Sequence, residues 1–219
     1  MNYQIFSAIN GLAGDWRVLD LFMIFAAKYL IFLFFAAAAV VTGLGTRDDG
    51  WWPYGAWRIG KVLATLAIAF VLSFSVRLMA LSERPFETHR VTQLISHAPG
   101  VSMPSDHAVS SFAVAIAVWF FVSRRWGPYF LGVAAVIAIS RVYVGVHYPA
   151  DVTAGALLAA VAGLGVWAIV LAVEERVLPA RQPAPEDDQL DDESSEHGAP
   201  DGDVPDHDAD DLPVDSHDG

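Results

Sequence analysis

Long apolar runs dominate this chain and indicate a membrane protein. Five windows carry few charges and meet or approach the ~20 apolar residues that an α-helix needs to cross a ~30 Å hydrocarbon core. These windows are residues 18–43, 58–81, 107–123, 127–146 and 150–173. A soluble protein would need a far larger polar shell to bury so many apolar segments. The sequence therefore predicts an all-α, polytopic membrane helix bundle with five spanning helices.

A shorter apolar pattern precedes the first window. Ile5, Phe6, Ile9 and Leu12 recur at helical spacing among polar neighbours. Such a pattern is typical of a short amphipathic helix that lies in the membrane interface or packs on a bundle. We therefore expect a sixth helical element at the amino terminus, which does not span the membrane.

The acidic residues are concentrated at the other end of the chain. Of the 25 Asp and Glu residues, 15 lie from Glu186 onward, whereas all 13 Lys and Arg residues lie at or before Arg181. The net charge of −12 therefore belongs to the tail and says nothing about the substrate. The tail is too polar and too highly charged to form a core. The sequence predicts a membrane-embedded domain, residues 1–178, followed by an acidic, disordered tail, residues 179–219.

Positive charges outside the windows predict the orientation, because cytoplasmic loops carry an excess of Lys and Arg. One side of the predicted bundle collects Arg47, Arg58, Lys61, Arg124, Arg125, Arg176 and Arg181. The other side includes the loop 82–106 and the turn near His147, and is predicted to be extracytoplasmic. An odd number of spans then places the amino terminus outside and the acidic tail in the cytoplasm.

Three polar clusters interrupt the apolar chain, and the predicted topology brings all of them to the extracytoplasmic face. They are the segment from Arg77 to Pro85, the tetrapeptide Pro104-Ser105-Asp106-His107 and the segment from Ser140 to Asp151. The chain has no cysteine, which excludes thiolate nucleophiles and thiolate metal sites. The coincidence of the three clusters on one face predicts a functional site there.

The third cluster has the arrangement of an activated histidine. Pro149 is favoured in the first turn of a helix, so His147 lies just before a predicted helix start. Asp151 falls in that first turn, where its carboxylate can accept a hydrogen bond from His147 and fix the tautomer of the ring. A histidine held in this way is suited to act as a base or a nucleophile. The alternative is an interfacial histidine that is merely capped by a carboxylate.

The second cluster and three arginines suit the binding of phosphate. Ser105 is a natural cap for the helix that follows, and the free N–H groups of a helix start bind phosphate. His107 in the same turn could give a proton to a leaving oxygen. Arg77, Arg84 and Arg141 match phosphate oxygens through paired hydrogen bonds. The alternatives are a simple helix cap for Ser105 and interfacial snorkelling for the arginines.

These residues resemble three motifs of the type 2 phosphatidic acid phosphatase superfamily: Lys-x6-Arg-Pro, Pro-Ser-Gly-His and Ser-Arg-x5-His-x3-Asp. The third motif is complete, whereas Arg77 stands in place of the lysine of the first and Asp106 in place of the glycine of the second. The Pro-Ser-Asp-His variant, the start Met-Asn-Tyr-Gln-Ile-Phe and the segment Glu83-Arg84-Pro85-Phe86 resemble bacterial undecaprenyl-diphosphatases of the bacitracin-resistance type.

The resemblance implies a catalytic cycle. His147 attacks phosphorus and becomes a phosphohistidine, Asp151 orients and supports it, and His107 protonates the leaving phosphate before water hydrolyses the intermediate. The phosphoryl oxygens are held by Arg77, Arg84, Ser105 and Arg141. No metal or other cofactor is required in this family, which agrees with arginines in the role that Mg²⁺ would fill.

The resemblance further implies hydrolysis of undecaprenyl diphosphate to undecaprenyl phosphate and inorganic phosphate at the outer face of the bacterial cytoplasmic membrane. This reaction recycles the cell-wall lipid carrier and confers bacitracin resistance. Two alternatives stay open: a phosphatase for phosphatidylglycerophosphate or phosphatidic acid, and a non-catalytic protein that binds or transports a polyprenyl phosphate. The set His107, His147 and Asp151 argues against the second, because binding alone needs no nucleophile.

The expected partners are the lipid bilayer and a lipid-linked phosphate, with no nucleic acid. Lys28 lies inside the first window and either faces the site, where it would replace the motif lysine, or packs toward a polar bundle interior. His89, Arg90 and His97 lie in the extracytoplasmic loop and receive no role.

Overall fold

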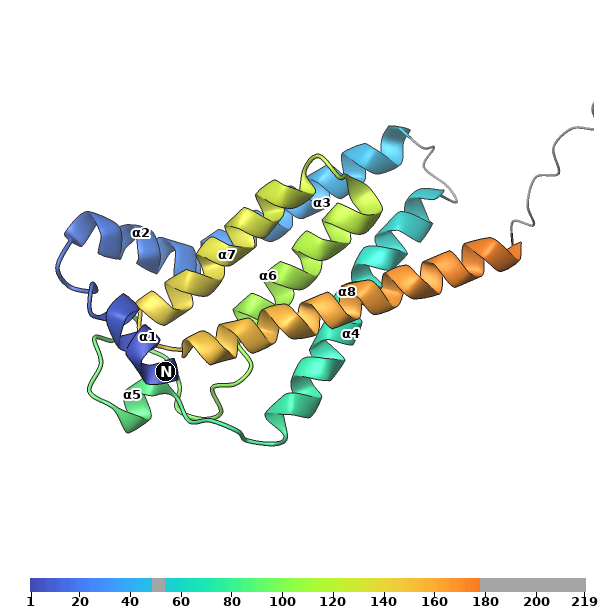
Figure 1. Cartoon of the computed structure of the whole chain (residues 1–219). Helices are drawn as coiled ribbons and strands as arrows, with labels where there is room; N and C mark the ends of the chain where they lie inside the picture. The colour runs from blue at the N-terminus through green and yellow to red at the C-terminus, as the bar shows by residue number, and fades with distance from the viewer. Residues whose placement is uncertain (49–53, 178–219) are drawn as a thin grey trace, which may run out of the picture. The chain divides into compact units, whose positions relative to one another are not determined.

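A computed structural model describes residues 1–48 and 54–177, which are mainly helical (Figure 1). The helices are α1 (Asn2–Asn10), α2 (Arg17–Lys28), α3 (Leu30–Asp48), α4 (Tyr54–Arg77), α5 (Pro85–Thr88), α6 (Asp106–Ala117), the π-helix η1 (Val118–Val122), α7 (Gly127–Tyr143) and α8 (Pro149–Val177). In these residues the only strand-like pairing is an isolated bridge between Glu83 and Val101. The predicted all-α class is confirmed, whereas the predicted acidic tail, 179–219, lies outside the described residues.

The helices differ in their capacity to cross a membrane. In the described part of the chain, α4 over Gly55–Arg77 and α8 over Pro149–Arg176 are long and apolar enough by themselves. The pair α2 and α3 gives a third candidate if it is one span. Asp106–Val122 and Gly127–Tyr143 are shorter apolar helices. Two or three spans are therefore supported by length and composition, and the count of five stays a prediction.

The first predicted window is broken, which corrects the expectation of one continuous helix over 18–43. α2 and α3 meet at Tyr29 with a bend of 54°. Lys28 is the last residue of α2 and is exposed, with its Nζ 5.8 Å from the centre of the Tyr29 ring. Lys28 therefore does not pack toward the bundle interior.

Helix α6 lies between α7 and α8, and it packs closely on α8 (Figure 1). A Cβ atom at Gly155 of α8 would come within 3.0 Å of the Val109 amide nitrogen of α6. At Gly163 it would lie 2.4 Å from the side chain of Ile116. Small residues at such contacts let two helix backbones approach each other. This packing holds the amino-terminal ends of α6 and α8 side by side.

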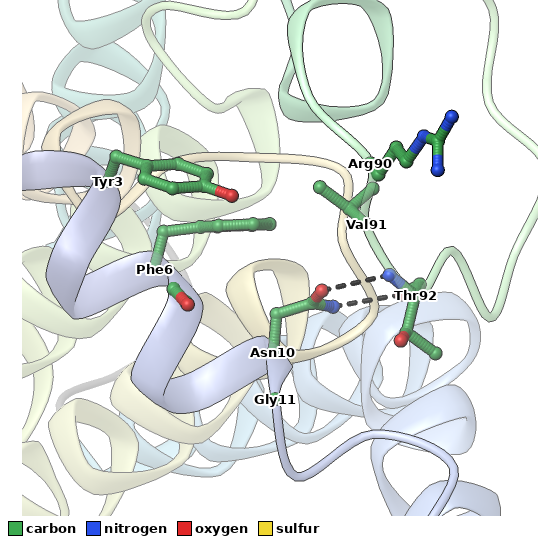
Figure 2. Close-up of a pocket in the computed structure, with 8 residues that line it drawn as sticks. Tyr3, Phe6, Asn10, Gly11, Arg90, Val91 and Thr92 are labelled. Carbon is green, nitrogen blue, oxygen red and sulfur yellow. Dashed lines mark hydrogen bonds between the residues drawn. The ribbon is translucent and has the colours of Figure 1, made fainter.

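The predicted amino-terminal helix is α1, which packs through Phe6 and Asn10 while Ile5 stays exposed. The Asn10 Nδ2 donates to the carbonyl oxygens of Thr92 and Tyr143, each at 2.8 Å. The Asn10 Oδ1 accepts from the Thr92 amide at 3.0 Å (Figure 2). One side chain thus ties α1, the loop after α5 and the end of α7 together.

A cavity of about 370 Å³ opens beside this tie, between α1 and the loop (Figure 2). Its walls include Tyr3, Ser7 and Arg90. The described residues that line it include none of the seven predicted site residues, so the cavity is separate from the predicted site.

Candidate active site

The three polar clusters meet where α4 and α7 end and where α6 and α8 begin. The Ser105 amide donates to the Asp151 carbonyl at 3.2 Å, which links the starts of α6 and α8. His107 lies within electrostatic range of Arg141 and His147. The structure therefore brings together residues that are separated by more than 70 positions in the sequence.

His147 and Asp151 face each other in the protein interior. The His147 Nδ1 lies 3.5 Å from the Asp151 Oδ2, and the two residues are 4% and 0% exposed. Asp151 Oδ2 also accepts from the Tyr148 amide at 2.7 Å. The carboxylate occupies the first turn of α8, where the helix dipole favours negative charge. This burial fixes both groups and strengthens their mutual attraction.

The contacts of His147 define its tautomer. The Arg84 Nη1 lies 3.4 Å from the His147 Nε2 and also donates to the Val146 carbonyl at 3.2 Å. Because a guanidinium group can only donate, Nε2 must carry the lone pair. The proton then resides on Nδ1, on the side of Asp151. Nε2 is therefore the ring atom that is free to attack an electrophile.

Ser102 is a member of the site that the sequence interpretation missed. Its side chain is fully buried, its Oγ lies 3.3 Å from the His147 Nδ1, and it donates to the Asp151 Oδ2. The Ser102 amide donates to the Ser82 carbonyl at 2.8 Å, which holds this loop residue in place. Ser102 lies at no helical spacing from the other site residues and belongs to none of the motifs. Its position two residues before Pro104, next to the second cluster, is the only sequence signal that could have indicated it.

We expect Ser102→Ala to lower kcat by about 10-fold, because His147 and Asp151 lose a shared hydrogen-bond partner. Ser82→Ala is the matched control, since the Ser82 Oγ reaches the Asp151 Oδ1 only at 3.4 Å. Steady-state phosphate release by the two purified variants would measure the difference. An unchanged kcat in Ser102→Ala, or a larger loss in Ser82→Ala, would contradict this assignment.

Three buried polar atoms of the described residues have no hydrogen-bond partner: Arg84 Nε, Ser105 Oγ and Arg141 Nε. All three belong to residues predicted to hold phosphoryl oxygens. Buried polar groups are normally paired, because an unpaired group loses its hydration without compensation. Each of these atoms can donate a hydrogen bond, so an anionic ligand rich in acceptor oxygens would satisfy them.

Ser105 corrects one detail of the sequence interpretation. It occupies the position before α6, but its hydroxyl makes no capping hydrogen bond. Its amide is engaged by Asp151 instead, and its hydroxyl is left unpaired in the interior. The predicted simple helix cap is therefore wrong for the side chain, and the hydroxyl is available to a ligand.

Arg77 and Asp106 are the two positions that depart from the superfamily motifs, and they pair with each other. The Arg77 Nη2 donates to the Asp106 Oδ1 and lies 3.4 Å from the Pro104 carbonyl oxygen. Arg77 thus reaches the second cluster and stands at its edge, with 36% of its side chain exposed. The carboxylate of Asp106 supplies a partner for the arginine that replaces the motif lysine.

Arg141 connects the site to the bend between α2 and α3. Its Nη1 donates to the Ala27 carbonyl oxygen at 2.9 Å, and the residue is 3% exposed. A helix break frees backbone carbonyls, which need other donors. Arg141 provides one such donor while its Nε remains unpaired. In the described residues, no group of three or more His, Asp or Glu side chains is placed to hold a metal ion.

The environment of His147 predicts the pH dependence of activity. Burial lowers the pKa of His147 from 6.5 to about 4; Arg141 and Arg84 act in the same direction, whereas Asp151 opposes them. The attacking imidazole must be neutral, and a lowered pKa keeps it neutral in mild acid. We expect the acid limb of kcat/KM, corrected for ionisation of the substrate phosphate, to be centred near pH 4. An acid limb centred near the unperturbed value of about 6.5 would contradict this.

Comparison with known proteins supplies the family context of this site. Residues 58–175 match the model of the PAP2 superfamily. The undecaprenyl-diphosphatase BcrC of Bacillus subtilis is 33% identical over 167 residues, which cover 74% of this chain and 81% of that protein. The undecaprenyl-diphosphatase of Sulfolobus acidocaldarius is 31% identical over 188 residues, which cover 80% and 74% of the two chains.

Two crystal structures share the fold. LpxE of Aquifex aeolicus has a TM-score of 0.62 at 22% identity, covering 75% of this chain and 93% of that chain. The PAP2-type phosphatidylglycerolphosphate phosphatase of Bacillus subtilis has a TM-score of 0.52 at 19% identity, covering 82% and 89%. At these identities the likeness shows the fold alone.

Proposed function

Because this chain belongs to the PAP2 superfamily and is a membrane phosphatase, we propose that it hydrolyses undecaprenyl diphosphate to undecaprenyl phosphate and inorganic phosphate. The substrate is inferred from the relatives, which are undecaprenyl-diphosphatases, and the chemistry is inferred from the site. The proposal rests on one observation above all. Three buried donors without partners belong to residues gathered around a histidine whose Nε2 carries a lone pair.

The proposed first step is attack of the His147 Nε2 on the terminal phosphorus. Arg84 now donates toward this nitrogen, so its hydrogen-bond donors would turn to a phosphoryl oxygen as the substrate enters. A P–N bond forms while the bond from phosphorus to the bridging oxygen breaks. His107 gives a proton to the leaving undecaprenyl phosphate. Arg77, Arg84, Ser105 and Arg141 hold the phosphoryl oxygens throughout.

The proposed second step is hydrolysis of the phosphohistidine by water. The P–N bond breaks, its electron pair returns to the His147 Nε2, and inorganic phosphate leaves. Asp151 supports the positive charge that the ring carries while it is phosphorylated, because its carboxylate lies 3.5 Å from Nδ1. Splitting one displacement into two lets the same donor set stabilise both transition states.

We propose a five-span arrangement for the body, residues 1–178. The spans are α2 with α3, α4, α6 with η1, α7, and α8. The site then lies on the extracytoplasmic face of the bacterial cytoplasmic membrane, and the acidic tail lies in the cytoplasm. Turnover of the diphosphate there recycles the cell-wall lipid carrier. It also removes the lipid that bacitracin binds, so greater expression should raise bacitracin resistance.

Phosphate release by the detergent-purified protein tests the substrate proposal. Undecaprenyl diphosphate and phosphatidylglycerophosphate are compared under the same conditions. A kcat/KM at least about 10-fold higher for the polyprenyl diphosphate is expected, which corresponds to ~1.4 kcal/mol of discrimination in the transition state. Preference for the glycerolipid would instead assign the site to another lipid phosphate. No release from either would favour a binding or transport role.

We expect activity to survive EDTA. Arginine side chains neutralise the phosphoryl charge in the proposed cycle, so removal of divalent cations should leave kcat within about 2-fold of its original value. The measurement compares phosphate release before and after dialysis against EDTA. A loss of activity that Mg²⁺ restores would contradict the assignment of this role to the arginines.

A further inference from the structure

His97 lies beside the nucleophile, although no motif includes it. Its ring centre is 6.2 Å from that of His147, and the two rings stand edge to face at 74°. His97 is half-buried and lies within electrostatic range of Arg84 and Arg141. The imidazole therefore lies close to the nucleophile and to two of the arginines proposed to hold the phosphoryl oxygens.

The loop that carries His97 is fixed on both sides. Before His97, Asn10 binds the backbone of Thr92 (Figure 2), and the Leu94 amide donates to the Val144 carbonyl at 3.2 Å. After it, the Gly100 amide donates to the Glu87 Oε2 at 3.0 Å. These contacts fix the backbone of the loop on either side of His97 and so limit where its side chain can lie relative to His147, as catalysis requires.

The tautomer of His97 follows from its own hydrogen bond. Its Nδ1 lies 3.1 Å from the Ala98 carbonyl oxygen, which can only accept, so Nδ1 carries the proton. Nε2 therefore carries a lone pair. Burial and the nearby arginines lower the pKa of His97, which keeps this lone pair unprotonated at neutral pH.

The lone pair makes His97 a hydrogen-bond acceptor. It thereby differs from the arginines and Ser105, which are proposed to donate hydrogen bonds to the phosphoryl oxygens. The phosphoryl oxygens are also acceptors, so they would repel the His97 Nε2 unless a hydrogen atom lay between the two. Water can supply that proton, because it donates to an imidazole nitrogen while its oxygen approaches phosphorus. The chemistry of His97 is thus that of a base and not that of an oxygen-binding donor.

We propose that the His97 Nε2 is the base that takes a proton from the water that hydrolyses the phosphohistidine. This inference rests on the proposed function. The water oxygen bonds to phosphorus, the P–N bond to His147 breaks, and its electron pair returns to the His147 Nε2. The water proton goes to His97, which releases it to solvent, and His107 regains from solvent the proton it gave to the leaving group. Separate histidines then serve the two half-reactions.

Rapid-quench kinetics with undecaprenyl diphosphate labelled in the terminal phosphate separate the two half-reactions. In His97→Gln, labelling of the enzyme should proceed within about 3-fold of the wild-type rate. Loss of the label should slow by about 10²-fold, the lower end of the range for general base catalysis. Phosphoenzyme should therefore accumulate. His89→Gln, an exposed histidine of the same loop, is the matched control and should behave as the wild type.

A second readout separates a base from a structural role. Hydroxylamine is a stronger nucleophile than water and depends less on a base, so it should restore loss of the label in His97→Gln. Equal slowing of both half-reactions, or no slowing of either, would overturn the role of His97 while leaving the proposed function intact. A wild-type enzyme that never carries label on His147 would overturn both.

Discussion

Replacing His147 by alanine is expected to abolish phosphate release, with a loss in kcat of ~10⁴-fold or more. The substitution removes the atom that forms the P–N bond, and neither Arg84 nor Ser102, which contact the His147 ring, can replace it. Arg84 can only donate, and Ser102 is engaged by Asp151. The remaining donors can still bind a phosphate, so KM should change far less than kcat. Phosphate release from undecaprenyl diphosphate, followed over a range of concentrations, measures both quantities.

The control for this variant is His89→Ala, because His89 is exposed and contacts Tyr3 and Tyr148 away from the nucleophile. Thermal unfolding in detergent establishes that both variants are folded. Residual turnover by a folded His147→Ala protein at more than ~1% of the wild-type rate would contradict the assignment of His147 as the nucleophile.

Asp151→Asn is expected to lower kcat by ~10³- to 10⁴-fold, comparable to the loss of the orienting carboxylate in other histidine-dependent enzymes. The amide has nearly the same shape, but it carries no charge to balance a phosphorylated imidazole ring. It can also present its NH₂ group to His147 or Ser102, which would favour the wrong tautomer of the ring. Because Asp151 is fully buried, this electrostatic contribution is screened little by solvent.

Asp20→Asn provides the control for Asp151→Asn. Asp20 also accepts hydrogen bonds, from the Tyr143 hydroxyl at 2.9 Å and the Gly14 amide at 3.1 Å, but it takes no part in the site. Comparable kcat losses in the two variants would indicate a general loss of folding. A kcat for Asp151→Asn within 10-fold of the wild type would show that His147 does not depend on this carboxylate.

The main features of the fold follow from hydrophobic patterning, because membrane helices need long apolar segments. Successive spanning helices run in opposite directions, so the end of one helix and the start of the next lie on the same face of the membrane. This arrangement brings Arg77, Ser105 and Asp151 to one face. The bend at Tyr29 could not be predicted. No proline or glycine marks it, and the buried Ala27 carbonyl beside it accepts a hydrogen bond from Arg141, a residue 114 positions away.

The parts of the site that escaped prediction lie in the loop between α5 and α6. Ser102 and His97 follow no helical period, and their positions depend on hydrogen bonds to α1, α5 and the turn before α8. Long-range contacts of this kind leave no local pattern in the sequence. The pairing of Arg77 with Asp106 was also not predicted. The sequence shows that each residue departs from its motif, but not that the two side chains contact each other.

The ion pair between Arg77 and Asp106 explains why the two departures from the motifs are compatible. An arginine that lacked Asp106 would place a further uncompensated positive charge beside Arg84, whose pKa is already lowered by burial and by Arg77. The Asp106 carboxylate offsets that charge and draws the Arg77 guanidinium toward the start of α6. The two substitutions are therefore compatible with each other for a physical reason.

Identification of the phosphorylated residue tests the central claim most directly. The enzyme is quenched in base during turnover of undecaprenyl diphosphate, and its peptides are mapped by mass spectrometry. We predict a phosphate group on Nε2 of His147 that is stable in base, labile in acid and missing from His147→Ala. Phosphate on another residue, or turnover by a wild-type enzyme that never becomes phosphorylated, would contradict the mechanism proposed for this site.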